Sequence, residues 1–205
     1  MDRIEIKRKA RELYKPNMWN IWKPILVLAL ISGVIGFIST MLFGDTSSIN
    51  EGLSSLVSIL LIPAEFGLTY YLMKLVRGEE YSLEDLKNQY PRFLPLFLIS
   101  LLTGLFIALW SILFIIPGII AAISYSMVEY IAVDPKYNNL SEMEVLKKSK
   151  ELMNGHKWEF VKFELSFIGW ILLSIMTCGV LSIWTIPYIE IANIIFYEEL
   201  IKNDK

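Results

Sequence analysis

The distribution of positive charge constrains this chain more than any other feature of its sequence. All 19 Lys and Arg residues fall within residues 3–23, 74–92, 136–162 and 202–205, and the three stretches between these clusters contain none. A Lys or Arg at the centre of a membrane-spanning helix costs about 2.5–3.5 kcal/mol, so long stretches without them are typical of membrane helices. Each stretch is long enough to cross the roughly 30 Å hydrocarbon core twice. The pattern therefore predicts three helical hairpins.

The fold class that follows is an all-α, polytopic membrane protein with six transmembrane helices. Its mean hydropathy of +0.50 and its 55% hydrophobic residues agree with one membrane domain over residues 1–205. Because basic loops stay on the cytoplasmic side, we expect all four clusters and both termini to be cytoplasmic. The expected parts are an amphipathic segment at 1–20, hairpins at 21–76, 92–133 and 158–201, a cytoplasmic loop at 77–91 and a cytoplasmic helix at 134–157.

Helix boundaries follow from prolines, caps and the ends of the apolar runs. Residues 2–15 are expected to form a helix that Pro16 ends, because proline lacks the backbone N–H that a helix needs. Ser141 with Glu144, and Ser82 with Asp85, have the spacing of a capping box at the start of a helix. The six transmembrane helices are predicted at about 21–43, 53–76, 93–116, 117–133, 158–180 and 184–201.

Two basic segments are candidates for contact with anionic lipids. In residues 2–15, basic side chains surround an apolar face, which is typical of a helix lying on the inner leaflet. The second segment is the predicted helix over residues 141–153. The candidate lipid contacts are Lys7, Arg8, Lys9, Arg11, Lys147, Lys148 and Lys150. The alternative is that the basic residues only fix the topology of the flanking helices.

The three hairpins also share a pattern that predicts an internal repeat. An aromatic residue precedes a glycine by eleven residues in each: Trp22 and Gly33, Phe93 and Gly104, Trp158 and Gly169. An isoleucine-proline pair occurs in or near the second helix of each hairpin. The arrangement would be a parallel threefold repeat about an axis along the membrane normal. Coincidence among hydrophobic hairpins is the alternative.

Carboxylates inside the predicted membrane helices are the candidate functional groups. Glu65 and Glu190 each lie twelve residues from a basic residue at the helix end, which is about 18 Å along a helix. Such a group should face the interior of the bundle or a water-filled cavity. The candidate polar cavity comprises Glu65, Thr69, Glu129, Glu190, Asn193 and Tyr197. Its residues could bind a headgroup, ion or proton, or could serve only as hydrogen-bonding contacts between helices. Pro63 and Pro187 lie near these carboxylates and would free backbone carbonyls, as in the broken helices of transporters.

No motif in the sequence indicates catalysis. His156 is the single histidine and Cys178 the single cysteine, and no phosphate-binding glycine loop or zinc-protease motif is present. We therefore expect no enzyme activity, no catalytic residues, no metal site, no cofactor and no nucleic-acid partner. The expected partners are membrane lipids, with a protein partner or a second copy of the chain as further possibilities.

The second half of the chain resembles an uncharacterised family of bacterial integral membrane proteins. The resemblance covers residues 105–200 and rests on several short motifs. They include Phe114-Ile115-Ile116-Pro117-Gly118, Tyr125-Ser126-Met127, Asp134-Pro135, Leu165-Ser166-Phe167-Ile168-Gly169-Trp170 and Pro187-Tyr188. The family is distantly similar to the membrane domain attached to some glycerophosphodiester phosphodiesterases. The resemblance implies a bacterial plasma-membrane location and a lipid-related role, and supplies no catalytic residues.

Two functions remain open at the level of sequence. The first is a non-enzymatic module in the cell envelope that binds a lipid or a partner protein. The alternative is a small transporter or channel-like protein that uses Glu65 and Glu190. Substitution of these carboxylates by glutamine should be nearly silent in the first case and should abolish activity in the second.

Overall fold

The structure of the protein is a computed structural model that describes residues 2–44 and 48–203, and over these residues it is helical without any strand. Lys205, in the last basic cluster, lies outside the described residues. The α-helices are α1 (Arg3–Phe43), α2 (Ser48–Arg77), α3 (Phe93–Leu113), α4 (Ile115–Ser124), α5 (Val128–Val133), α6 (Glu142–Leu152), α7 (Lys157–Leu165), α8 (Ile168–Met176) and α9 (Ser182–Asn203). Three short 3-10 helices are η1 (Leu83–Leu86), η2 (Tyr90–Arg92) and η3 (Pro135–Tyr137).

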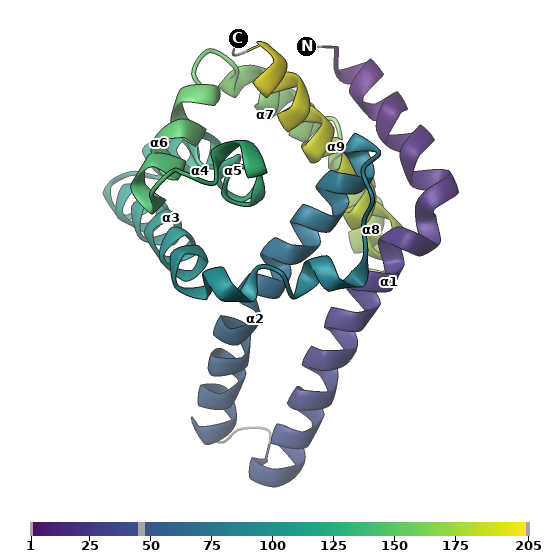
Figure 1. Ribbon diagram of the computed structural model, residues 1–205, viewed down its shortest axis with the longest axis vertical. Coiled ribbons are helices and arrows are strands. Elements are labelled where there is room, and N and C mark those ends of the chain that lie inside the picture. The colour runs from purple at the N-terminus through teal and green to yellow at the C-terminus, as the bar shows by residue number, and fades with distance from the viewer. Residues whose placement is uncertain (1, 45–47, 204–205) are drawn as a thin grey trace.

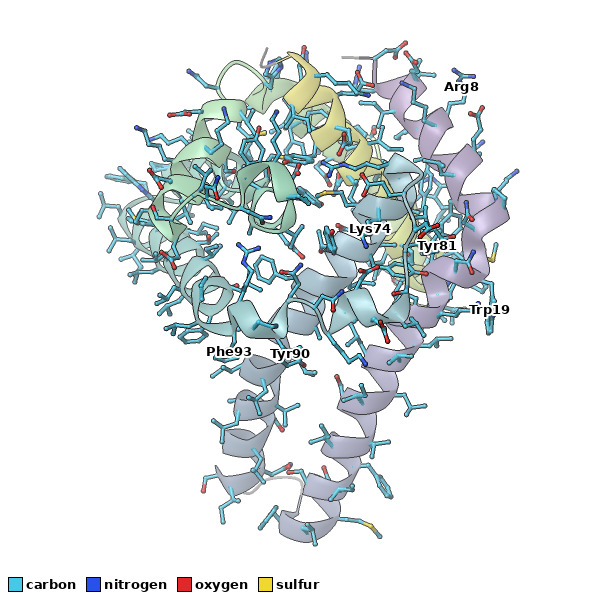
Figure 2. The ribbon with its side chains drawn as sticks, in the orientation of Figure 1. Arg8, Trp19, Lys74, Tyr81, Tyr90 and Phe93 are labelled. Atoms are coloured by element: carbon cyan, nitrogen blue, oxygen red, sulfur yellow. The ribbon has the colours of Figure 1, made fainter. Side chains whose placement is uncertain are left out.

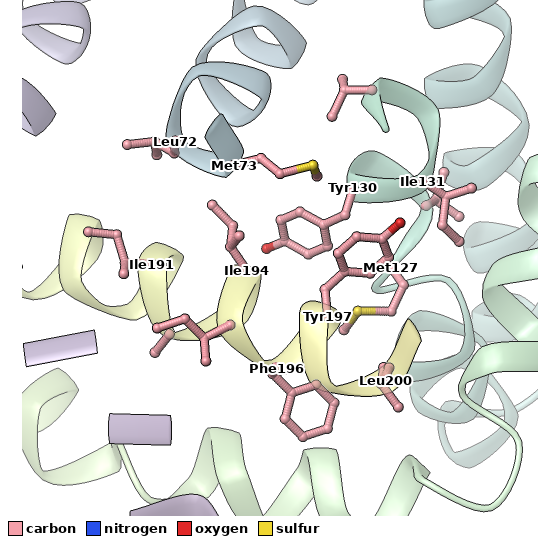
Figure 3. Packing of buried hydrophobic residues seen from close by; sticks show 14 of the residues in the cluster. Leu72, Met73, Met127, Tyr130, Ile131, Ile191, Ile194, Phe196, Tyr197 and Leu200 are labelled. Atoms are coloured by element: carbon pink, nitrogen blue, oxygen red, sulfur yellow. The ribbon is translucent and has the colours of Figure 1, made fainter. Parts of the chain in front are cut away.

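Most of the helices gather at one end of the molecule, and the hairpin of α1 and α2 extends from them toward the other end (Figure 1). We call the meeting point the charged end; it contains the start of α1, the end of α2, η1 to η3, α6 and the end of α9. Here α1 packs against α9, and α2 packs against both α5 and α9. The hairpin of α1 and α2 continues away from this end as a stalk. Most of the buried hydrophobic residues lie near the charged end, as the close view of α2, α5 and α9 illustrates (Figure 3).

Four helical stretches are long and apolar enough to cross a membrane: Arg3–Phe43, Ser48–Arg77, Leu83–Leu113 and Ile115–Val133. Large apolar side chains cover the tips of their hairpins and stay exposed, for example Met41 at 76% and Ile112 at 84%. Such a surface is stable in lipid and unfavourable in water. The structure thus confirms four helical stretches of the predicted length and apolar character, whereas their crossing of a membrane and a third crossing hairpin in α7 to α9 stay predictions.

Pro16 does not end the first helix, so that prediction was wrong. α1 runs without interruption from Arg3 to Phe43, with Pro16 and Pro24 inside it. Figure 1 shows that α1 instead changes direction after its first turns, and Figure 2 places Arg8 and Trp19 on the two sides of this bend. A proline inside a helix removes one hydrogen bond and bends the helix, while packing on both sides keeps the rest helical.

Two of the predicted helices are broken, and neither break contains a proline. The predicted helix at 117–133 is divided into α4 and α5 by Tyr125–Met127, and the predicted helix at 158–180 is divided into α7 and α8. Backbone carbonyls that have no helical partner at the breaks accept hydrogen bonds from side chains of other helices. Ser149 of α6 donates a hydrogen bond of 2.9 Å to the carbonyl of Ser124, and the Lys7 ammonium donates one of 2.8 Å to the carbonyl of Ser166. Pro63 and Pro187, by contrast, lie inside continuous helices.

Local sequence signals located several helix ends correctly. Both capping boxes are present, at Ser82 with Asp85 and at Ser141 with Glu144. The connection between α3 and α4 is a single extended residue, Phe114, so α4 starts two residues before Pro117. One turn further on, a Cβ on Gly118 would lie 2.3–3.0 Å from atoms of Ser111, which shows how closely α3 and α4 approach.

The threefold repeat stays a prediction. Its three glycines, Gly33, Gly104 and Gly169, each have open space around the position of a Cβ. Close helix packing therefore does not explain why the spacing recurs.

Candidate functional site

The predicted polar residues come from α2, α5 and α9, which pack together near the charged end. Two of the three carboxylates receive a hydrogen bond from a hydroxyl on a neighbouring helix. The Thr69 hydroxyl donates to Glu129, and the Tyr130 hydroxyl donates to Glu190 over 3.0 Å. Because Glu129 and Tyr130 are consecutive on α5, that helix joins α2 to α9 through these two bonds.

Glu65 lies apart from Glu190. Its side chain is exposed on α2 and lines a pocket of about 250 Å³ together with Glu129, Thr103 and Ser126. The Thr103 hydroxyl in this pocket is buried and has no hydrogen-bond partner among the described residues. The structure thus divides the predicted residues between two places: Glu65 and Glu129 at this pocket, and Glu190 on the other side of Tyr130.

Two tyrosine rings connect Glu190 to the charged end. Tyr130 and Tyr197 lie with their ring centroids 5.6 Å apart, and Figure 3 shows their hydroxyls pointing in opposite directions. Both residues are buried, and the Tyr197 hydroxyl donates 2.8 Å to Asp134. Asn193, one turn after Glu190, has a buried side-chain oxygen without a partner among the described residues.

A buried ion cluster that was not among the predicted site residues lies beyond Tyr197. Arg77, the last residue of α2, contacts Asp134 through two nitrogen–oxygen pairs of 2.6 and 3.3 Å. Its Nε also donates 2.7 Å to Glu198 of α9. Burial alone would raise the pKa of Asp134, but hydrogen bonds from Arg77, from the backbone N–H of Lys136 and from Tyr197 hold it below its ordinary value.

The only sequence signals for this cluster were an arginine at a helix end and an Asp-Pro pair, and both are also ordinary markers of a boundary. Arg77 and Glu198 continue outward into a pocket of about 540 Å³ between α1, α2 and α9. Lys9, Glu199 and Lys202 line the same pocket. The Lys9 ammonium lies 3.2 Å from Glu199. Charged groups therefore extend without interruption from the buried Asp134 to the surface.

The predicted lipid contacts on α1 divide into inward and outward side chains. Lys7 lies inward: besides its bond to Ser166 it sits over the Phe167 ring, 4.2 Å from the centroid. It thus caps the carbonyl of Ser166, directly after the C-terminal end of α7, where the helix dipole favours a positive charge. Arg8 and Arg11 are exposed. The apolar face of this part of α1, with Ile6 and Ala10, is buried in the hydrophobic core.

The predicted contacts on α6 are mostly outward. Lys147 and Lys150 are exposed, and Lys147 lies 4.0 Å from Glu151 one turn further along the helix. Lys148 is half-buried. In the described part of the chain, His, Cys, Asp and Glu residues form no group of three that could hold a metal ion. The arrangement offers two kinds of group: carboxylates that accept hydrogen bonds from hydroxyls of neighbouring helices, and cations that can bind an anion.

Comparison with known proteins gives one result. A family model described as "Protein of unknown function (DUF975)" matches the chain over residues 1–124 and 112–204. No curated protein and no solved structure matches. The resemblance to an uncharacterised family is confirmed by this match, and the distant similarity to a phosphodiesterase membrane domain stays a prediction.

Proposed function

Since the chain belongs to the DUF975 family of proteins of unknown function, we propose from its structure that it is a non-enzymatic membrane protein that binds phospholipid headgroups at its charged end. Its location would be the bacterial plasma membrane, with several crossings, and the charged end with both termini would face the cytoplasm. The basic clusters support this orientation, because positively charged loops are retained on the cytoplasmic side. A partner protein or a second copy of the chain would bind in addition to lipid.

The observation that carries the proposal is the order in which exposed side chains occur at the charged end. On α1 the exposed Arg8 and Arg11 precede Trp19, which is 65% exposed, and the exposed apolar surface follows. On α7, Trp158 is also 65% exposed, and the Lys162 ammonium lies over its ring at 5.5 Å. Cations suit the headgroup layer, and tryptophan suits the boundary between headgroups and acyl chains. The two segments, which are far apart in the sequence, thus both have a cation and an exposed tryptophan, although only α1 has them in this order.

The test is the lipid composition around the full-length protein. The protein would be placed in nanodiscs that contain equal amounts of phosphatidylglycerol and phosphatidylcholine, extracted gently, and examined by native mass spectrometry. We expect retained lipid to be enriched in phosphatidylglycerol, and the enrichment to fall when Lys147 and Lys150 are replaced by glutamine. Lys7→Gln is a matched control, because the ammonium of this lysine is already bonded to the backbone carbonyl of Ser166. Retention of no lipid, or of both lipids equally, contradicts the proposal.

A second function, proton-coupled transport, is favoured by one specific observation. Short contacts connect Glu190 through Tyr130, Tyr197 and Asp134 to Arg77 and the outer pocket. Carboxylates inside the membrane form proton relays in pumps and transporters, and a relay here would need water between Tyr130 and Tyr197, which contact each other through their rings and not by a hydrogen bond.

This second function makes a distinct prediction at Glu190. Glu190→Gln keeps a hydrogen-bond acceptor for Tyr130 but cannot release a proton. Proton flux into liposomes that contain the wild-type protein should be lost in this variant, while melting temperature stays close to that of the wild type. Equal flux in the two proteins, or no flux above empty liposomes, excludes the carboxylate mechanism.

A further inference from the structure

A polar pocket beside the end of α2 has the features of a specific headgroup site. It has a volume of about 390 Å³, is open to the surface, and is lined by the last turns of α2, the segment that contains η1 and η2, and the start of η3. Its charged lining residues are Lys74, Asp85 and Arg92, which gives two cations and one carboxylate. Lys74 lies one turn before α2 ends at Arg77, and Arg92 immediately precedes α3. Both cations therefore lie where helices that cross a membrane would reach the headgroups.

The carboxylate in this pocket is already fully engaged. Asp85 is 3% exposed; it accepts 2.8 Å from the Lys74 ammonium and 2.9 Å from the backbone N–H of Ser82. The Lys74 ammonium also lies over the Tyr70 ring, 4.9 Å from its centroid. Lys74 and Asp85 thus form a fixed wall whose net charge is near zero, and the positive charge of the pocket comes from Arg92.

Arg92 offers one side of its guanidinium to a ligand. Its hydrogen bonds within the described residues both come from Nη1, to the carbonyl of Ala132 at 3.1 Å and to Asn138 at 3.4 Å. These bonds hold the plane of the guanidinium in place. The remaining N–H groups, on Nη2 and Nε, form the parallel pair that matches two oxygens of a phosphate.

Gln89 adds a second requirement for a ligand of this pocket, namely a hydrogen-bond donor. The residue is 6% exposed, and its side-chain oxygen is buried without any hydrogen-bond partner among the described residues. A buried acceptor of this kind is unfavourable unless a donor reaches it. Because Gln89 and Arg92 line the same pocket, a molecule that fills it needs both phosphate oxygens and a nearby N–H or O–H group.

We propose that this pocket binds the headgroup of a phospholipid, with the phosphate on Arg92 and a hydroxyl or ammonium hydrogen on Gln89. The acyl chains would extend out of the pocket across Tyr90 and Leu94. These two residues are close to pocket-lining residues in the sequence and are 42% and 62% exposed. Figure 2 shows Lys74 on α2 and Tyr90 on the segment that leads to α3. The inference rests on the proposed function and names its site and ligand class: phosphatidylglycerol and phosphatidylethanolamine carry the required hydrogen, whereas phosphatidylcholine does not.

The experiment measures lipid affinity by native mass spectrometry of the delipidated, full-length protein in detergent. Phosphatidylglycerol, phosphatidylethanolamine, phosphatidylcholine and soluble glycerol phosphate are titrated separately. Arg92→Gln should weaken binding of all three lipids about tenfold, which corresponds to about 1.4 kcal/mol. Gln89→Met keeps the size of the side chain and removes the acceptor, so it should weaken the first two lipids and leave phosphatidylcholine unchanged. Lys15→Gln, at an exposed position of α1 outside the candidate lipid contacts, is the control for loss of one charge.

Each other result overturns a different part of the reasoning. If the wild type retains lipid and Gln89→Met binds all three lipids as the wild type does, the pocket is not the site, although the proposed function stands. If the wild type binds no lipid, both proposals fail. If glycerol phosphate binds as tightly as the lipids, the ligand is a soluble phosphate ester. Arg92 also bonds to the backbone, so Gln89→Met carries the test if Arg92→Gln does not fold.

Discussion

The contact between Arg77 and Asp134 permits the sharpest test of what holds the charged end together. The Asp134 side chain is 2% exposed and that of Arg77 is 20% exposed, so the pair is largely removed from solvent. Removal of one partner from a buried pair costs about 3–5 kcal/mol, because the remaining charge is buried without compensation. We therefore expect Arg77→Met to lower the melting temperature on the order of 10 °C for a chain of this size.

The reverse substitution should cost less. Asp134→Asn keeps the shape of the side chain and one acceptor oxygen for the Tyr197 hydroxyl, and it loses the charge. A hydrogen bond to a charged group contributes about 1.5–3 kcal/mol, which is the loss expected here. Arg77 keeps a second partner in Glu198, 2.7 Å away, which limits the damage.

The double variant measures the interaction between Arg77 and Asp134 separately from the contacts that each makes with other residues. If the two residues stabilise each other, Arg77→Met with Asp134→Asn should be less destabilising than the sum of the single variants by about 1–3 kcal/mol. Melting of the four proteins in one detergent, followed by circular dichroism, gives this coupling. Arg8→Met is the control, since Arg8 and its partner Glu12 are both more than 60% exposed. Additive effects, or a change in Arg77→Met no larger than in the control, would refute the reasoning.

Three further outcomes follow from individual contacts. The pKa of Asp134 is held below its ordinary value, so its stabilising effect is complete above about pH 4 and is lost as the pH falls through the lowered pKa; melting between pH 3 and 7 should show this loss in the wild type and not in Asp134→Asn. Gly67→Ala should destabilise by about 1–3 kcal/mol in thermal melting, because a Cβ there would lie 2.5–2.8 Å from the backbone of Leu86. Lys7→Ala should lower the melting temperature and leave lipid enrichment unchanged, because its ammonium caps the carbonyl of Ser166.

The positions of the long helices could be predicted because the reason for them is local. A basic residue in the bilayer is unfavourable wherever the rest of the chain lies, so the gaps between basic clusters locate the apolar helices. α2, α3 and α9 begin or end within a few residues of the predicted boundaries. Capping boxes are equally local, since both partners lie within four residues, and both were found.

The helix breaks could not be predicted because their causes are distant in sequence. Nothing at Tyr125–Met127 forbids a helix, and the carbonyl released there is bonded by Ser149, 25 residues further on. At the break after α7, the carbonyl of Ser166 is bonded by Lys7, which lies 159 residues away. Prolines were the local signal for a break, yet α2 and α9 continue through theirs. Tertiary contact, which the sequence does not display, decides these cases.

The same limit applies to the site. Glu65 and Glu190 were grouped because both lie at the same predicted depth in the membrane. Depth does not determine the direction in which a side chain points around its helix. In the structure Glu65 is exposed, whereas Glu190 faces Tyr130. Arg77 and Asp134 were visible only as markers of helix ends. Their contact is made by residues 57 positions apart, and no spacing rule within a single helix connects them.

Asp134 links the two proposed functional sites, one through its neighbours in the chain and the other through its carboxylate. Its neighbours Val133 and Pro135 line the pocket of Arg92, while its carboxylate holds Arg77 and Tyr197 in the core. A headgroup in the pocket therefore restrains the same short segment whose carboxylate ends the chain of contacts from Glu190. Binding can change that chain only if this segment takes up a second position for which the headgroup has a different affinity. Lipid titrations of Asp134→Asn and flux measurements at defined lipid composition thus address the same structural element.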